Sequence, residues 1–176
     1  IAVIMGGYSS EHDISVKSGT TVFNHIDSNL YNPYKVIIDK DNWNLVTSDG
    51  VNYPIDREHF NCTVNDVEIN FELVFVMIHG TPGEDGVIQK YFDNLNIPYT
   101  GPSSEVALLT FNKKSCVEFA RKNNIRTANS ILIKENTDFS YEKIGEELKF
   151  PLFVKANNSG SSYGISKVYN VKELEI

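Results

Sequence analysis

Two short polar loops in the first half of the sequence carry side chains that could bind a charged ligand. Residues 6–11 follow the apolar run 1–5 and end in Glu11, and residues 79–86 follow the apolar run 73–78 and begin with His79. A carboxylate at a helix start could receive an ammonium group, and a histidine at a strand end could reach a carboxylate or a phosphoryl oxygen. The structural alternative is that Glu11 complements the helix dipole and His79 is a hydrogen-bonded turn residue.

A third polar loop, residues 156–164, is rich in glycine, serine and asparagine. Glycines let backbone N–H groups close around an anion, hydroxyls add donors, and Lys155 directly before the loop adds a positive charge. The loop could therefore cradle a phosphate; a solvated hairpin loop is the alternative. It lacks the GxxxxGK[ST] pattern of a P-loop, and residues 6–7 do not match the dinucleotide fingerprint GxGxxG.

The elements that must position the first two loops alternate between strands and helices. Apolar runs predict strands buried on both faces at 1–5 and 73–78, a short strand at 34–38, and a hairpin over 43–47 and 51–53. Helices are predicted over 11–26, with Ser9 or Ser10 as cap and Ile14, Ser18, Val22 and Ile26 at helical spacing, and over 87–94. This alternation predicts a mainly parallel sheet, whose strand ends share one edge, so the two loops should lie together and Glu11 and His79 could face one ligand.

The second half of the sequence has a different pattern. Helices are predicted to begin at residue 103 and over 113–123 and 141–148, and strands over 130–133, 152–155 and 165–169. The last two strands should pair antiparallel across the glycine-rich loop. We therefore expect a domain boundary near residue 101, with domains at 1–101 and 102–176. A helix capped by Asn170 begins just before the sequence stops, which indicates a fragment of a longer protein.

Composition excludes several classes of protein. The chain has 176 residues, with 16 basic and 23 acidic side chains, a net charge of −7. Nucleic acids and anionic membranes require basic patches, so neither is an expected partner. The longest strictly apolar run has six residues, 73–78, whereas a membrane-spanning helix needs about 20. No signal peptide is recognisable, and Cys62 and Cys116 fit no metal-binding spacing, so we expect reduced thiols in a cytoplasmic protein.

Four segments together resemble the motifs of the D-alanine–D-alanine ligase family. They are GGYSSEHDISVKSG at 6–19, HGTPGEDGVIQ at 79–89, PYTG at 98–101 and FVKANNSGSSYGISKV at 153–168. Their order and approximate spacing match the family, over roughly the first half of its length. The resemblance implies an α/β fold, with an N-terminal parallel-sheet, Rossmann-like domain that precedes the ATP-grasp region, followed by part of the central α+β ATP-grasp domain. It also implies an ATP-dependent ligase that joins two D-alanines through a D-alanyl phosphate for peptidoglycan synthesis.

The resemblance implies a role for each matching residue. Glu11 would bind the ammonium group of the first D-alanine, His79 would lie near its carboxylate, and Ser161 would hydrogen-bond Glu11 in a network needed for catalysis. Lys113 and Lys155 would bind ATP phosphates, covered by the loop residues Gly160, Ser161 and Ser162. Apart from the alignment of residues 110–113, Lys113 would be interpreted as an ordinary exposed helix lysine.

Other family features are expected outside this chain. They include the ligands of Mg²⁺ (or Mn²⁺), so the chain should hold no metal site and should not catalyse ligation alone. Ala156 replaces the usual proline after Lys155, which removes no donor. The resemblance further suggests a homodimer formed through the N-terminal domain. Two alternatives stay open: a D-Ala–D-Lac or D-Ala–D-Ser ligase, and a non-catalytic ligand-binding domain of ATP-grasp ancestry.

Overall fold

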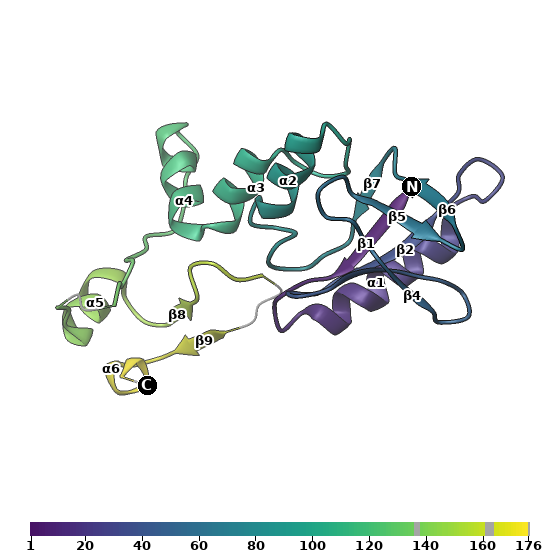
Figure 1. The fold of residues 1–176 in the computed structure, drawn as a ribbon. Coiled ribbons are helices and arrows are strands. Elements are labelled where there is room, and N and C mark those ends of the chain that lie inside the picture. Colours follow the sequence, from purple (N-terminus) through teal and green to yellow (C-terminus); the bar gives the residue numbers. More distant parts are fainter. Residues whose placement is uncertain (136–137, 161–163, 176) are drawn as a thin grey trace. The chain divides into compact units, whose positions relative to one another are not determined.

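The structure is a computed structural model that describes residues 1–135, 138–160 and 164–175. The chain divides into two compact units, Ile1–Leu108 and Leu109–Ile176 (Figure 1). None of the described helices is long and apolar enough to cross a lipid bilayer. Both cysteines are free thiols, as expected, with Cys62 buried and Cys116 half-buried.

The first unit is built on a five-stranded sheet in the order β4-β3-β2-β1-β7. The central strand β1 pairs parallel with both β2 and β7, which confirms the predicted parallel core. Strands β2, β3 and β4 pair antiparallel, as the predicted hairpin requires. The bounds are β1 Ala2–Gly6, β2 Tyr34–Ile38, β3 Trp43–Val46, β4 Asn52–Pro54 and β7 Val74–Val76.

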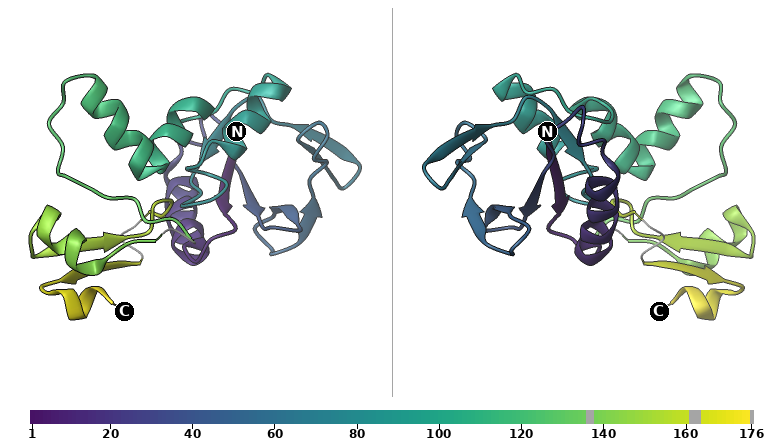
Figure 2. Two further views of the ribbon diagram at one scale, coloured as in Figure 1. Left: turned by 90° about the vertical axis from the view of Figure 1, so that its left-hand side faces the viewer. Right: turned by 90° about the vertical axis from the view of Figure 1, so that its right-hand side faces the viewer.

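Both faces of β1 are covered, which explains its unbroken apolar sequence. Helix α1 (His12–His25) lies along β1 and β2, as Figures 1 and 2 show. The helix approaches the sheet so closely that a side-chain carbon on Gly19 would lie 2.6 Å from the Cβ of Met5. The opposite face holds the main core, where Ile4 packs with Phe92 of helix α2 (Val87–Leu95) and with Phe60.

The buried face of α1 differs from the residues whose helical spacing predicted the helix. Ile14 is the first of those residues, yet it is 54% exposed. The buried residues of α1 are instead the small ones, Ser15 and Gly19. A bulky stripe would hold the helix farther from the sheet, whereas small side chains allow it to approach.

The segment before β7 contains a second hairpin, which the sequence analysis did not predict. Strands β5 (Asn61–Val64) and β6 (Val67–Asn70) pair antiparallel. Asn65 and Asp66 form the turn, with φ of 49° and 65°. Consecutive positive φ values are typical of a type I′ hairpin turn, which favours asparagine and aspartate.

The second unit pairs strand β8 (Leu152–Lys155) antiparallel with β9 (Ile165–Val168), as predicted. Its helices are α4 (Lys113–Lys122), α5 (Tyr141–Leu148) and α6 (Val171–Leu174), while α3 (Ser104–Phe111) crosses the division between the units. The predicted strand over 130–133 is wrong: these residues are irregular. In the described part of this unit the only ladder is β8–β9, so an apolar run without a partner strand has no ladder to join.

Candidate functional site

The two polar loops of the first unit are hydrogen-bonded to each other at the carboxyl ends of β1 and β7. The Tyr8 N–H donates to the carbonyl of Thr81 at 2.8 Å, and the Ser9 hydroxyl donates to the carbonyl of His79 at 3.1 Å. Ser9 Oγ also accepts the N–H of Glu11 at 3.2 Å. Ser9 therefore links the backbones of the two residues that the sequence singled out.

Ser9 does not act as the predicted helix cap. The N-cap position of α1 is Glu11, whose side chain makes no capping hydrogen bond. The Ser9 hydroxyl is engaged with the neighbouring loop instead, because its proton goes to the His79 carbonyl. The serine thus joins two loops rather than ending one helix.

A second serine, Ser15, connects helix α1 to both strands. Ser15 is fully buried; its Oγ accepts the Gly6 N–H at 2.8 Å and donates to the carbonyl of Met77 at 2.7 Å. Gly6 ends β1 and Met77 follows β7, so one hydroxyl satisfies a backbone group at each strand end. This bond network fixes the start of α1 against both loops.

Glu11 is the buried charge of this region, with 8% of its surface exposed. Its Oε1 has no hydrogen-bond partner among the described residues. Its Oε2 faces Gly80, where a side-chain carbon would lie 2.8 Å from that oxygen and 2.6 Å from Ser9 Oγ. A buried carboxylate oxygen without a partner is costly, so this site favours a ligand with a positive charge and N–H donors.

His79 is half-buried, and its ring is held from α1. Nε2 lies 3.1 Å from the hydroxyl of Ser18, while the His79 carbonyl accepts from Ser9. Both the ring and the backbone of His79 are thus bonded to the α1 segment that carries Glu11. The predicted proximity of these two loops is what the structure shows.

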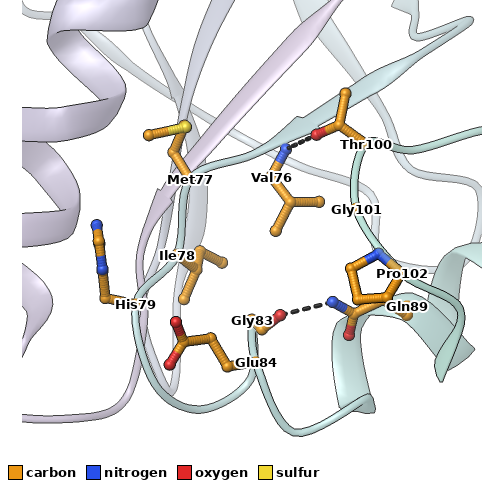
Figure 3. Close-up of a pocket in the computed structure, with 10 residues that line it drawn as sticks. All are labelled: Val76, Met77, Ile78, His79, Gly83, Glu84, Gln89, Thr100, Gly101 and Pro102. Carbon is orange, nitrogen blue, oxygen red and sulfur yellow. Dashed lines mark hydrogen bonds between the residues drawn. The ribbon is translucent and has the colours of Figure 1, made fainter. Parts of the chain in front are cut away.

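A hollow of about 220 Å³ opens beside His79 (Figure 3). One side carries the end of β7 and the loop after it, and the other carries residues 100–102. Inside it, Gln89 Nε2 donates to the Gly83 carbonyl at 2.5 Å, and the Val76 N–H donates to Thr100 Oγ1 at 3.0 Å. The lining residues are Val76, Met77, Ile78, His79, Gly83, Glu84, Gln89, Thr100, Gly101 and Pro102.

His12, next to Glu11, ties the start of α1 to the end of β2. Its Nε2 lies 2.8 Å from Asp39 and its Nδ1 lies 3.2 Å from Asp13. The hydrogen bond with Asp13, followed by that with Asp39, raises the pKa of His12 above its usual value of 6.5, and partial burial opposes this. The protonated form therefore strengthens this attachment.

In the second unit, Lys113 meets the glycine-rich loop. Its Nζ donates to the carbonyl of Ser159 at 2.5 Å, and its backbone N–H donates to the carbonyl of Asn157 at 3.1 Å. The N–H of Lys114 adds a bond to Asn157 Oδ1 at 3.0 Å. These hydrogen bonds attach the first turn of α4 to the start of the glycine-rich loop.

Lys155 ends β8, directly before the same loop. Its ammonium lies 5.7 Å from the centre of the Phe153 ring, and Lys167 of β9 lies 5.9 Å from that ring. Two lysines on neighbouring strands therefore present positive charge around one exposed aromatic ring. The remaining predicted residues, Ser161 and Ser162, lie outside the described residues.

Sequence reasoning missed the roles of the three serines that organise the first loop pair: Ser9 was predicted only as a helix cap, Ser18 was noted only for its helical spacing, and Ser15 was not singled out. Ser9, Ser15 and Ser18 lie within the motif at 6–19, but only their contacts distinguish them from cap or surface serines. One signal was available for Ser15. Ser15 lies four positions before Gly19, so the two small residues share one face of the helix. A helix that packs on an apolar strand through small residues approaches it closely, and a serine on that face can hydrogen-bond the strand backbone.

The first unit has a mixed parallel and antiparallel sheet with helices packed on it, and its loops form a site at the carboxyl ends of the parallel strands. These features define a ligand-binding α/β domain. Two family profiles match the chain: "D-ala D-ala ligase N-terminus" over residues 1–102 and "D-ala D-ala ligase C-terminus" over residues 119–176. The chain belongs to the D-alanine–D-alanine ligase family, which confirms the resemblance drawn from its motifs.

Individual relatives agree with the profiles. The chain is 42% identical over 176 residues to the D-alanine–D-alanine ligase of Flavobacterium johnsoniae, covering all of this chain and 54% of that protein. Its fold is similar to the VanG D-Ala:D-Ser ligase of Enterococcus faecalis, with a TM-score of 0.81, 28% identity, and coverage of 99% of this chain and 56% of that one. It is also similar to D-alanine–D-alanine ligase from Bacillus anthracis complexed with ATP, with a TM-score of 0.73, 25% identity, and coverage of 99% and 52%. The chain thus spans about half the length of these relatives.

Proposed function

We propose that the complete protein is an ATP-dependent ligase that joins two molecules of D-alanine into D-alanyl-D-alanine for peptidoglycan synthesis. ATP is converted to ADP and phosphate in the same reaction. We place this activity in the cytoplasm and in a homodimer formed through residues 1–101, with residues 102–176 as the beginning of the nucleotide-binding domain. The family assignment and the two-loop site support the ligase activity in this proposal.

The observation that carries the proposal is the buried carboxylate of Glu11. Its unpartnered Oε1 and the Oε2 beside Gly80 offer acceptors to an ammonium group, the one group of an amino acid that both is cationic and donates three hydrogen bonds. His79, bonded to the same helix segment, would receive the substrate carboxylate. This pairing of one acceptor and one donor group suits a small zwitterion.

The nucleotide would be held by the second unit. Lys113 and Lys155 supply ammonium groups, and Gly160, Ser161 and Ser162 would supply donors from the loop between β8 and β9. The binding of Lys113 to the loop backbone supports this assignment, because it brings a cation to the glycine-rich segment. ATP would supply the phosphoryl group that activates the first carboxylate, and Mg²⁺ would neutralise the phosphates.

Magnesium ligands are proposed to lie beyond this chain. In the portions of the chain that the structure describes, no group of three or more histidine, cysteine, aspartate or glutamate side chains could hold a metal. Because the chain spans about half the length of its relatives, we propose that the 176 residues alone do not sustain ligation. Ser161 is proposed to complete the substrate network with Glu11.

The test is ADP release by the complete gene product with Mg-ATP, with and without D-alanine. We expect D-alanine-dependent ADP release together with the dipeptide, and a large loss of it in Glu11→Gln. Glu105→Gln is the matched control, since Glu105 is an exposed carboxylate in the first turn of α3. Equal activity of the Glu11 variant and wild type would contradict the assignment of the ammonium site.

A second candidate is a ligase that joins D-alanine to D-serine or D-lactate. The similarity to the VanG D-Ala:D-Ser ligase favours including it. ADP release only when D-serine or D-lactate accompanies D-alanine would support this candidate. No release with any of these substrates would favour a binding domain without catalysis.

A further inference from the structure

The ring of His79 meets a hydroxyl whose single proton is already committed. Ser18 lies on α1, and its Oγ donates to the carbonyl of Ile14, one turn earlier, at 2.7 Å. The same oxygen lies 3.1 Å from Nε2 of His79. The two contacts join residues on α1 and on the loop after β7.

The donor of the second contact follows from counting protons. A serine hydroxyl has one proton and two lone pairs, and a carbonyl oxygen only accepts. The short contact with Ile14 therefore takes the Ser18 proton, since two oxygens at 2.7 Å would otherwise repel each other. Ser18 can only accept from His79, so Nε2 must carry a proton.

We propose that Ser18 is a positioning residue that holds His79 in the Nε2–H form and turns Nδ1 toward the substrate. The role in substrate binding rests on the proposed function. Among the described residues Nδ1 has no hydrogen-bond partner, which leaves it for a ligand. A carboxylate bound there requires a proton on Nδ1 as well, so His79 would meet it as an imidazolium with both nitrogens donating.

The ring needs this anchor because the backbone alone does not orient it. The Ser9 hydroxyl fixes the carbonyl of His79, but rotation about the side-chain bonds would still move the ring. Ser18 removes that freedom from the opposite side. His79 is thus bonded twice to the segment that carries Glu11, so the two ends of an amino-acid substrate would be recognised by groups set from one helix.

The first test is spectroscopic and independent of catalysis. Long-range ¹H–¹⁵N NMR of the complete gene product, labelled on histidine, distinguishes a protonated from an unprotonated ring nitrogen, and His79→Gln assigns the signals. At pH 8 without substrate we expect a protonated Nε2 and an unprotonated Nδ1, and a mixture of both neutral forms in Ser18→Ala. A protonated Nδ1 with an unprotonated Nε2 in the wild type would overturn the proposal.

The second test separates positioning from a structural role. Losing one hydrogen bond should raise the KM for the first D-alanine about five-fold in Ser18→Ala, with kcat within about two-fold of wild type. Ser18→Thr restores the hydroxyl and should restore the KM. Thr21→Ala is the matched control, because Thr21 makes the same kind of bond, to Lys17 at 3.0 Å, on the exposed side of α1.

Each result has a distinct meaning. An unchanged KM in Ser18→Ala, or an equal rise in Thr21→Ala, would overturn the positioning role. Absence of ligation by the wild type would refute the proposed function. In that case the NMR result would still decide whether Ser18 sets the protonation of the His79 ring.

Discussion

Replacing Ser15 with alanine should destabilise the first unit more than a single serine contact would normally do. The change leaves the Gly6 N–H and the Met77 carbonyl without the hydroxyl that bonds both. A buried backbone group without a partner costs about 1–3 kcal/mol. The Gly6 bond is buried and the Met77 bond is partly buried, so the second group recovers part of its cost from water.

The expected net loss is about 2 kcal/mol. The two lost bonds together contribute about 2–3 kcal/mol, and the better helix propensity of alanine offsets about 0.5 kcal/mol. The measurement is equilibrium urea unfolding followed by tryptophan fluorescence. Trp43 is the single tryptophan of the chain and is 6% exposed in the core of the first unit, so its signal reports on that unit.

Thr21→Ala is again the control, since it removes an exposed helix hydroxyl with a bond to Lys17. We expect its free energy of unfolding to stay within about 0.5 kcal/mol of wild type. If Ser15→Ala also falls within that range, then Ser15 does not satisfy buried backbone groups, and the account of how α1 is attached to both loops is refuted.

Three further changes test other parts of the structure. Gly80→Ala should weaken substrate binding, measured as KM, and should lower the free energy of unfolding in urea more than Gly50→Ala does. Both glycines have positive φ, but of the two only Gly80 has atoms within 4 Å of a new side-chain carbon. The pKa of His12 is raised, first by its hydrogen bond with Asp13, so the stabilisation from His12 should be full below about pH 6.5 and should decline as pH rises through the folded-state pKa. The difference in free energy of unfolding between wild type and His12→Gln across about pH 5.5–8.5 measures this contribution. A difference that grows with pH would contradict the assignment. The side chain of Asn112 caps α4 by accepting the N–H of the third helical residue. Asn112→Ala should therefore lower the free energy of unfolding by about 1 kcal/mol, measured by urea unfolding followed by circular dichroism.

The elements with strong periodicity or unbroken apolar runs were predictable. The sequence predicted β1, α2, α5 and β8 within about one residue of their ends, because burial and capping act locally at those positions. Three of the four residues at 130–133 are apolar as well, yet no described strand pairs with them. Strand formation depends on a partner that local sequence does not specify. The hairpin at Asn65 was missed because its turn chemistry, not its hydrophobicity, defines it.

The candidate site was predictable in its residue types but not in its bonds. Glu11 and His79 could be assigned to one sheet edge from the rule that parallel strands end together. The rule does not say which groups hold them there. Ser9, Ser15 and Ser18 take those roles through contacts that depend on how closely α1 approaches the sheet, and Gly19 permits that approach. Such a distance is a property of the packed structure.

The position of β1 at the centre of the sheet has a consequence for synthesis. Strand β1 is synthesised well before the segment after β7, to which its end is connected: the hydrogen bonds from Ser9, Ser15 and Ser18 to that segment span 70, 62 and 61 residues. At about 5–20 residues per second, that segment follows roughly 3–14 seconds after β1. During this interval the apolar strand β1 lacks its second partner strand, β7, and its hydrophobic side chains are incompletely covered. Strand β1 is therefore open to aggregation during this interval, and a chaperone that covered the strand would protect the nascent chain.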